Sequence, residues 1–408
     1  MKRTLACLLS LLLMFSLILT ARAEEAQDML LVEWGRAKVR GADVWNPVQY
    51  PINTNKGTLM SVGWDAEGYG GYGAFPVEDG VTLPPVTVSG DCTYCTLEDG
   101  TIALLDIDDA YQTKKLVIPA QIDGKTVTRL GYDLNVMTLN ASMDRYFLAD
   151  VVESVVIPDT VRLIAPGIFA KKGGKLKISF PDSLESLGSF LWDNSVTKLR
   201  LPKNLKVLGD YAFADTDIAD IRLPDGLREI GFAALMEARC KSITIPGSVQ
   251  KLGPYLCCHM PKLTSAKLKN GLTVLPEGMF MGCRKLKKIE IPATVTAISS
   301  SAFEDCEALS ALGFAKKAAL QSIGDNAFKY TGLKKVTLPA GLVSIGEDAF
   351  FGCEKLASVV IPSSVESIGM RAFDGCSEKL VLSVEEGSYA ESYAHEHGLR
   401  VKVTRPRK

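Results

Sequence analysis

The chain has 408 residues, of which 47% are apolar and 23% are charged, and its formal net charge is −1. These values argue against a wholly disordered, a collagen-like or a strongly nucleic-acid-binding protein. The length suits two or three ordinary domains or one long repeat array.

The first 23 residues have the pattern of a secretory signal peptide. Lys2 and Arg3 precede an apolar run from Leu5 to Leu19, and the small-residue site Ala21-Arg22-Ala23 follows it. An uncleaved membrane anchor is the less favoured alternative, because the run is shorter than the roughly 18 to 20 apolar residues of a spanning helix. We therefore expect a secreted, extracellular or cell-surface protein with no membrane insertion after cleavage.

Residues 24–90 form a Gly- and aromatic-rich segment that ends in a Pro-containing linker. The segment holds three of the four tryptophans, Trp34, Trp45 and Trp64. These side chains could make a sugar-stacking platform or a small strand module, but we favour a loosely ordered arm. The run Gly68–Gly73 fits G-x-G-x-x-G, yet no helix pattern follows it, so a dinucleotide site is not indicated.

Residues 137–376 repeat about every 23 residues, which lies within the leucine-rich-repeat range. An alternating stretch such as Lys288–Ile291 predicts a short strand in each unit, and the Pro after it ends the strand. Counting from that Pro, Gly at the seventh position should permit a turn. The origins are Pro158, Pro181, Pro202, Pro224, Pro246, Lys269, Pro292, Lys317, Pro339 and Pro362.

A large side chain stands eleven residues after each origin, and stacked units would join these side chains into one buried column. We therefore predict a β-rich α/β repeat solenoid of about ten coils of 21–25 residues, with a parallel sheet on its concave side and a cap at each end. The column residues are Phe169, Trp192, Phe213, Leu235, Cys257, Phe280, Phe303, Phe328, Phe350 and Phe373.

The unit Ile361-Pro-x-x-Val-x-x-Ile-Gly-x-x-Ala-Phe-x-x-Cys376 resembles the bacterial surface leucine-rich repeat of the BspA type, also found in treponemal proteins. The resemblance covers about residues 91–404. It implies an N-terminal cap and first repeat at 91–136, and a cap helix, strand and tail at 377–408. Departures occur at 137–150, an insertion, and around Lys317, where the unit lengthens. The family's association with adhesion implies a bacterial surface protein that binds other proteins.

Cysteines follow the repeat. Cys283, Cys306, Cys353 and Cys376 all lie fourteen residues after their origins, which favours buried thiols that fill the coil corner over disulfides. Cys92-x-x-Cys95 is a single pair, whereas structural zinc usually needs four ligands, and residues three apart in a strand face opposite sides.

No motif predicts catalysis, and we expect no enzyme activity, no cofactor and no metal site. His395-Glu-His397 lacks the H-E-x-x-H spacing of a zinc protease and is interpreted as exposed cap residues. Asp106, Asp108 and Asp109 lack the glycine and the distal glutamate of an EF-hand, so we expect them to be solvated.

A basic stripe is the candidate binding surface. Residues two and four positions before each origin should point outward from the sheet. Most of the charged residues at these positions are basic, and only Asp220 and Glu290 are acidic. The basic stripe consists of Lys177, Lys198, Arg200, Arg222, Lys267, Lys288 and Lys335.

The stripe suits an unidentified acidic protein or polyanionic glycan, although lysines that merely keep the sheet soluble are an alternative. We expect a monomeric, non-catalytic interaction or adhesion protein that binds no nucleic acid. The alternative function is a glycan-binding protein in which aromatic residues of 24–90 make the contacts and the solenoid is a scaffold.

Overall fold

The computed structural model describes residues 49–51, 58–64, 70–76, 85–107, 113–131, 151–165, 168, 176–188 and 199–405. The chain divides into two compact units, one of residues 1–84 and 133–136 and the other of 85–132 and 137–408. The signal-peptide pattern, the insertion at 137–150, Phe169, Trp192 and Lys198 lie outside the described residues.

The first unit contains a three-stranded antiparallel sheet. Strand β2 (Thr58–Trp64) lies between β1 (Gln49–Pro51) and β3 (Gly70–Pro76). This sheet matches the small strand module named above as an alternative to a loosely ordered arm. Gly70, Gly71 and Gly73 of the glycine motif belong to β3 and pair with β2, so they do not form a turn between a strand and a helix.

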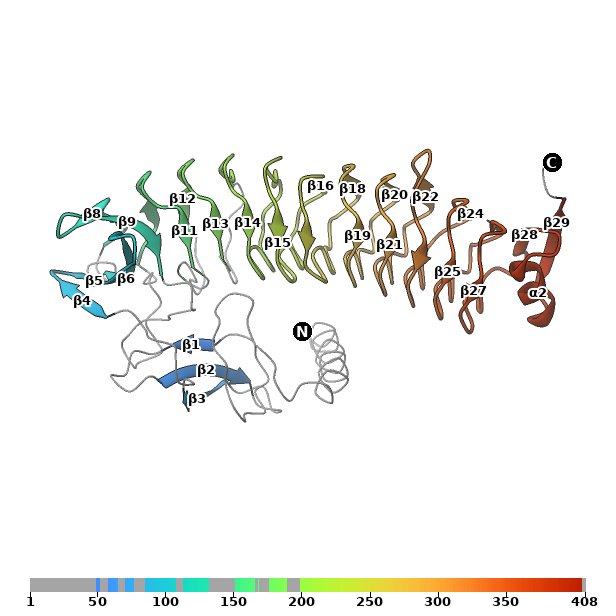
Figure 1. Cartoon of the computed structure of the whole chain (residues 1–408), viewed down its shortest axis with the longest axis horizontal. Helices are drawn as coiled ribbons and strands as arrows, with labels where there is room; N and C mark the ends of the chain where they lie inside the picture. Colours follow the sequence, from blue (N-terminus) through green and yellow to red (C-terminus); the bar gives the residue numbers. More distant parts are fainter. Residues whose placement is uncertain are drawn as a thin grey trace. The chain divides into compact units, whose positions relative to one another are not determined.

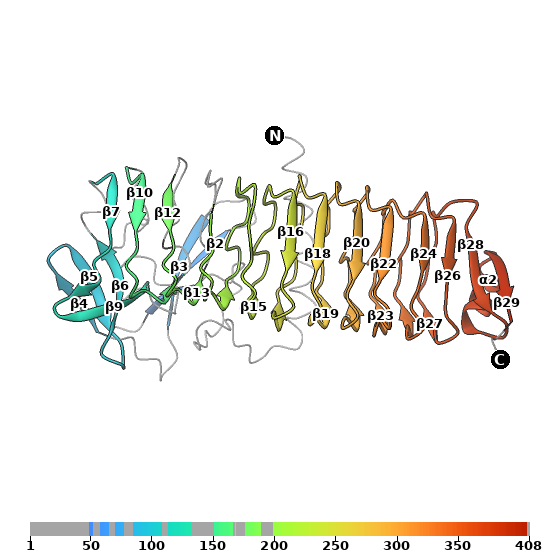
Figure 2. The same cartoon turned by 90° about the horizontal axis from the view of Figure 1, so that it is seen from above.

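The second unit is a parallel β-solenoid of about 11 turns, as the repeat predicts (Figure 1). Two rows of strands run along it. The longer-strand face, seen in Figure 2, has strands of three to five residues. Its strands are β7 (Lys115–Val117), β10 (Ser154–Val156), β12 (Lys177–Ser179), β16 (Ser242–Ile245), β18 (Ser265–Leu268), β20 (Lys288–Ile291), β22 (Ala311–Phe314), β24 (Lys335–Thr337), β26 (Ser358–Val360), β28 (Val381–Glu385) and β29 (Arg400–Thr404).

The second row consists of two-residue strands, most of which end in a buried Leu or Ile six residues after the origin. All pairs within this row are parallel. The strands are β11 (Leu163–Ile164), β13 (Ser186–Leu187), β14 (Val207–Leu208), β15 (Glu229–Ile230), β17 (Lys251–Leu252), β19 (Val274–Leu275), β21 (Ala297–Ile298), β23 (Ser322–Ile323), β25 (Ser344–Ile345) and β27 (Ser367–Ile368).

Each end of the solenoid carries different structure. At the N-terminal end, β4 (Val86–Ser89), β5 (Cys92–Thr96) and β6 (Ile102–Ile107) are antiparallel, and β6 then pairs in parallel with β9 (Lys125–Leu130), which also pairs with β8 (Gln121–Ile122). At the C-terminal end, Ser388 caps the N-terminus of helix α2 (Tyr389–Glu396). Its hydroxyl oxygen accepts a hydrogen bond from the amide of Glu391. The N-terminal end of the described solenoid thus carries antiparallel strands, and the C-terminal end carries a helix followed by the parallel strand β29.

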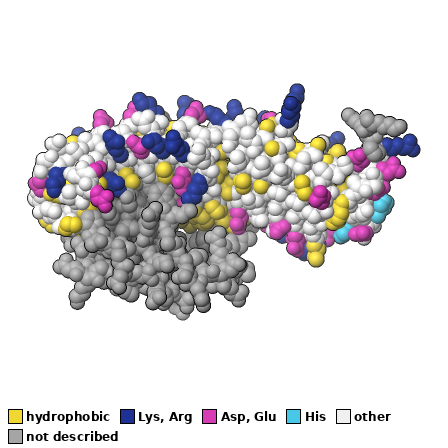
Figure 3. Space-filling model, in the orientation of Figure 1, with side chains coloured by type: hydrophobic (Ala, Val, Ile, Leu, Met, Phe, Trp, Pro, Cys, Tyr) yellow, Lys and Arg dark blue, Asp and Glu magenta, His cyan; other side chains and the backbone are white. Residues whose placement is uncertain are grey.

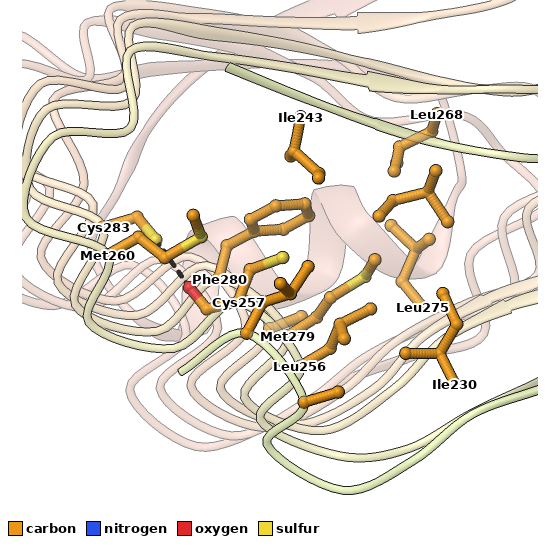
Figure 4. Close-up of a cluster of buried hydrophobic side chains, with 14 of the residues drawn as sticks. Ile230, Ile243, Leu256, Cys257, Met260, Leu268, Leu275, Met279, Phe280 and Cys283 are labelled. Atoms are coloured by element: carbon orange, nitrogen blue, oxygen red, sulfur yellow. Dashed lines mark hydrogen bonds between the residues drawn. The ribbon is translucent and has the colours of Figure 1, made fainter. Parts of the chain in front are cut away.

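The column at the eleventh position is confirmed. Its described members are buried, and successive rings from Phe280 to Phe373 stack with centroids 5.2 to 5.5 Å apart. Tyr393 of α2 meets Phe373 edge-on at 6.3 Å, so the cap helix covers the end of the column. Figure 4 shows the middle of this core, where Cys257 and Phe280 lie between aliphatic side chains of both strand rows.

The glycines at the seventh position precede the expected turns, but they are not required for a left-handed backbone. None of Gly209, Gly231, Gly253 or Gly346 has a positive φ. Instead, a side chain added at Gly253 would overlap the backbone of Gly231 in the preceding coil. A turn does begin at the residue after each of these glycines, but the reason for glycine is the close approach of stacked coils and not a positive φ.

Left-handed backbone occurs two residues later, at residues that are mostly not glycine. Tyr255 and Ser301, at the ninth position of their coils, have φ of 57° and 55°, and His259 and Asp305, at the thirteenth, have 55° and 58°. From Tyr211 to Gly352, the amides of the ninth, eleventh and thirteenth residues donate to carbonyls of the next coil, as Phe303 does to Ala327 at 2.8 Å. Hydrogen bonds between coils stabilise this conformation, which costs free energy in an isolated chain.

One repeat origin is corrected by the strand register. Ile291 pairs with Phe314, so Ala315 and not Lys317 is the residue equivalent to Pro292. The unit does lengthen here, as expected, because Phe314 and Ile323 are nine positions apart where Ile291 and Ile298 are seven apart. The extra residues lie after β22 and include the left-handed Lys317, with φ of 56°.

Candidate functional site

The described residues of the basic stripe are exposed on the longer-strand face. Lys177, Lys288 and Lys335 each begin a strand, and the burial pattern of β20 and β24 alternates from exposed to buried. Lys267 is the third residue of β18 and is exposed as well. Strand alternation thus places these side chains outward, as the sequence predicts.

Arg200 and Arg222 also point to solvent, but the residues around them are not in a strand. Among the described residues, the ladder of longer strands is interrupted here, between β12 and β16, and again between β18 and β20 and between β22 and β24. Figure 3 shows Lys and Arg side chains along the upper side of the solenoid, which is the longer-strand face of Figure 2. Lys198 lies outside the described residues.

The stripe has little acidic compensation. Among the described residues, only Arg222 of the stripe forms an ion pair, with Asp220 at 4.0 Å. By contrast, basic residues beside the two-residue strands meet a glutamate of the preceding coil. Lys251 lies 3.0 Å from Glu229, and Lys206 lies 2.5 Å from Glu185. Positive charge is therefore neutralised beside the two-residue strands and left open on the longer-strand face.

Sequence reasoning missed basic residues at both ends of the same rows. Lys115 aligns with Ser154, which aligns with Lys177, so Lys115 extends the row toward the N-terminal cap. Arg400 aligns with Val381 at the other end. The signal for Lys115 was present, because Pro119 follows it four positions later, as a Pro follows the stripe lysines.

The cysteine column is confirmed as a set of packed thiols. The Sγ atom of Cys283 donates to the carbonyl of Cys257 at 3.0 Å, a bond drawn in Figure 4, and that of Cys306 donates to the carbonyl of Phe280 at 3.2 Å. Burial raises the pKa of Cys283 to about 12 and raises that of Cys306 also. Such thiols are poor nucleophiles, since the reactive species is the thiolate.

Cys92, Cys95 and Asp106, which the sequence offers as candidate metal ligands, contact other residues of the solenoid. Cys92 packs against the main core while Cys95 lies in a separate cluster with Ala103 and Leu105, so the two face opposite sides as expected. Asp106 is buried, with its carboxylate accepting the amide of Ile107 at 2.9 Å, and the expectation of a solvated side chain was wrong for it.

The two histidines of the cap helix are exposed, as expected. His397 stacks on Tyr393 at 4.0 Å, and His395 lies 4.0 Å from the carboxylate of Glu391. Asp108 and Asp109 lie outside the described residues.

Within the described ranges, no three His, Cys, Asp or Glu side chains gather as a possible set of metal ligands. In the same ranges, no helix has the length and apolarity to cross a membrane.

The solenoid resembles solved bacterial structures. A leucine-rich repeat protein from Bacteroides ovatus ATCC 8483 is 24% identical, covers 78% of this chain and 76% of its own, and superposes with a TM-score of 0.53. A leucine rich cell surface protein from Faecalibacterium prausnitzii A2-165 is 19% identical over 77% of this chain and 98% of its own (TM-score 0.36). The pneumococcal vaccine antigen PcpA is 16% identical and covers 80% of this chain and 100% of its own, with a TM-score of 0.44.

No curated protein matches the chain significantly. The family model described as "BspA type Leucine rich repeat region (6 copies)" matches residues 143–260, 189–310 and 321–394, which together make up more than half of the sequence. The protein belongs to the BspA-type leucine-rich repeat family.

Proposed function

We propose that this protein is an exported, monomeric interaction protein that adheres to an acidic partner protein through the basic stripe, without catalysis. The observation that carries the proposal is the uncompensated charge on the longer-strand face. Lys177, Arg200, Lys267, Lys288 and Lys335 are exposed and form no ion pair among the described residues.

Exposed positive charge on the basic stripe would contribute more to the specificity and the rate of association with an acidic partner than to the affinity. Lysines in rows a strand spacing apart present several cations to one extended acidic surface, and each contact is weakened by salt. Family membership supports a role in protein interaction, because stacked repeats expose a long face of regularly spaced side chains.

The test of the stripe is retention on immobilised poly-glutamate at increasing salt. We expect the variant Arg200→Glu/Lys267→Glu/Lys288→Glu to elute at much lower salt than the wild type. The matched control is Lys206→Glu/Arg228→Glu/Lys251→Glu, which makes the same change of net charge beside the two-residue strands. Equal elution of the two triple variants would refute the proposal. Retention on heparin but not on poly-glutamate would indicate a glycan partner instead.

Export has its own test. The pattern of residues 1–23 supports passage out of the cytoplasm. In a bacterial host, the full chain should lose its first 23 residues and leave the cytoplasm, while a chain lacking those residues should stay there. N-terminal sequencing of the exported product checks the cleavage after Ala23, and retention of Met1 in the product would contradict it.

A further inference from the structure

The longer-strand face is interrupted between β22 and β24. Strand β22 pairs with β20, and β24 pairs with β26, but among the described residues no ladder joins β22 to β24. A cleft of about 520 Å³ lies at this interruption, lined by residues of both strands and of the turns after them. We call it the β22/β24 cleft.

The added residues after β22 account for the cleft. They lengthen the turn that contains Lys317 by two positions relative to the preceding coil, so the turn forms one wall. The outward position between Glu290 and Thr337 on the longer-strand face is Gly313, which has no side chain to fill the space. Space for a ligand therefore results from one longer turn and one missing side chain.

The floor of the cleft is apolar and only partly covered. Leu312 and Phe314 are half-buried, whereas their register partners Ile289 and Ile291 are 3% and 0% exposed. Leu338 also lines the cleft. A ligand that covered Leu312 and Phe314 would remove apolar surface from water, which is favourable in proportion to the area buried.

The rim of the cleft is basic. Lys317 and Lys335 both line it and are exposed, and among the described residues neither forms an ion pair. An apolar floor beside two cations fits a ligand that carries an apolar group next to a carboxylate.

We propose that the β22/β24 cleft binds an extended segment of a partner protein in which apolar and acidic side chains alternate. An apolar side chain enters over Leu312 and Phe314, and a neighbouring carboxylate meets Lys317 or Lys335. This inference rests on the proposed function and adds the place where the partner is anchored. The apolar floor favours a protein segment over a sulfated glycan, which has no apolar side chain to place there.

The probe is a fluorescently labelled, acetylated and amidated octapeptide of alternating Glu and Leu, titrated with the mature chain and followed by anisotropy. Gly313→Leu fills the cleft without strain, because a Cβ at Gly313 would lie 3.8 Å from the nearest atom, Cγ of Glu290. Lys335→Glu reverses one rim charge. The matched controls are Thr244→Leu in β16 and Arg228→Glu beside the two-residue strands, which lies outside both the cleft and the stripe.

We expect saturable binding by the wild type, a loss of about tenfold or more in affinity for Gly313→Leu and for Lys335→Glu, and changes below about threefold for both controls. Circular dichroism melting checks that each variant is folded. If either Gly313→Leu or Lys335→Glu does not fold, the other still tests the cleft. No binding of the octapeptide by the wild type, or equal binding by Gly313→Leu and Thr244→Leu, would overturn the inference.

The proposed function and this inference can fail separately. If poly-glutamate retention still depends on the stripe while Gly313→Leu binds the octapeptide like the wild type, the cleft proposal is wrong and the stripe proposal stands. If the octapeptide does not bind, and a labelled heparin octasaccharide binds the wild type but not Gly313→Leu, a glycan is the ligand and the inference is wrong as stated.

Discussion

The rings of Phe303 and Phe328 stack 5.2 Å apart with their planes 1° from parallel, although two extra residues lie in the chain between their coils. The added length is taken up in the turn around Lys317 and not in the core. Insertions at the edge of the solenoid are therefore compatible with an unbroken aromatic column, and the edge is where new binding features can arise.

Removal of one ring from the column should destabilise the solenoid strongly. Phe303 is 0% exposed, and Phe303→Ala leaves a cavity between Phe280 and Phe328. We expect the free energy of unfolding to fall by about 3 to 5 kcal/mol, as for other buried Phe→Ala changes. Urea unfolding followed by circular dichroism measures it, with Phe303→Leu expected to lose less. An unchanged urea midpoint for Phe303→Ala would show that the column is not a source of stability.

Replacement of a seventh-position glycine should destabilise the protein even when the new residue is alanine. A Cβ at Gly253 would overlap the backbone of Gly231, so Gly253→Ala should force the coils apart and lower the unfolding midpoint. Gly226→Ala is the control, because its Cβ would lie 3.8 Å from the nearest atom, the carbonyl oxygen of Lys203. We expect the control to unfold like the wild type or later, since it restricts the unfolded chain. Similar midpoints for the two variants would contradict close approach as the reason for glycine.

The thiol column predicts which cysteines can be alkylated. Cys283 and Cys306 are fully buried, and burial raises the pKa of both. With iodoacetamide at pH 8, we expect neither to be labelled in the folded protein and both to be labelled in urea, as read by peptide mass spectrometry. Cys376, which is half-buried, should be modified before either of them. Early labelling of Cys306 in the folded protein would indicate that the coils open locally.

Glu304 should make stability depend on pH. Burial raises its pKa, and Asp305 and Asp348 raise it further against the opposite effects of Ser301 and Lys329. The folded state then holds a proton that the unfolded state has released, so stability falls as pH rises from the unfolded pKa of about 4.3 through the raised folded pKa.

The variant Glu304→Gln removes this titration. We therefore expect its melting temperature to exceed that of the wild type at pH 7 by more than at pH 4. Asp374→Asn, at an exposed acid in the last coil, is the control for loss of a charge. An equal difference between Glu304→Gln and wild type at both pH values would refute the assignment.

The repeat predicted much of the fold because each coil has the same packing problem. The spacing from Pro to Phe placed the column correctly from Phe213 to Phe373. The close approach at Gly253 was not predictable, because a one-dimensional pattern shows that glycine is required but not whether φ or a neighbouring backbone requires it. The origin at Lys317 was wrong for a related reason, since without a Pro only the pairing of Ile291 with Phe314 sets the register.

The candidate site was predictable in its positions but not in its environment. Strand alternation located Lys267, Lys288 and Lys335 on an exposed face. Whether each charge meets an acid depends on side chains of the coil before or after it, so the contrast with Lys251 and Glu229 emerged only from the structure. The longer unit around Lys317 was foreseen, but the cleft beside β22 was not, because only the pairing of Glu290 with Gly313 shows that this outward position lacks a side chain.

The amides of the ninth, eleventh and thirteenth residues give one edge of the solenoid a single hydrogen-bond direction. From Tyr211 to Gly352 these N–H groups all donate toward the C-terminus, as Tyr211 does to Phe232 and Gly352 to Asp374. Beside the two-residue strands the amides donate the other way, as Gly209 does to Leu187 and Gly253 to Ile230. The peptide dipoles of these two edges therefore oppose each other, and the solenoid, like a β-sheet, has only a small net dipole along its axis.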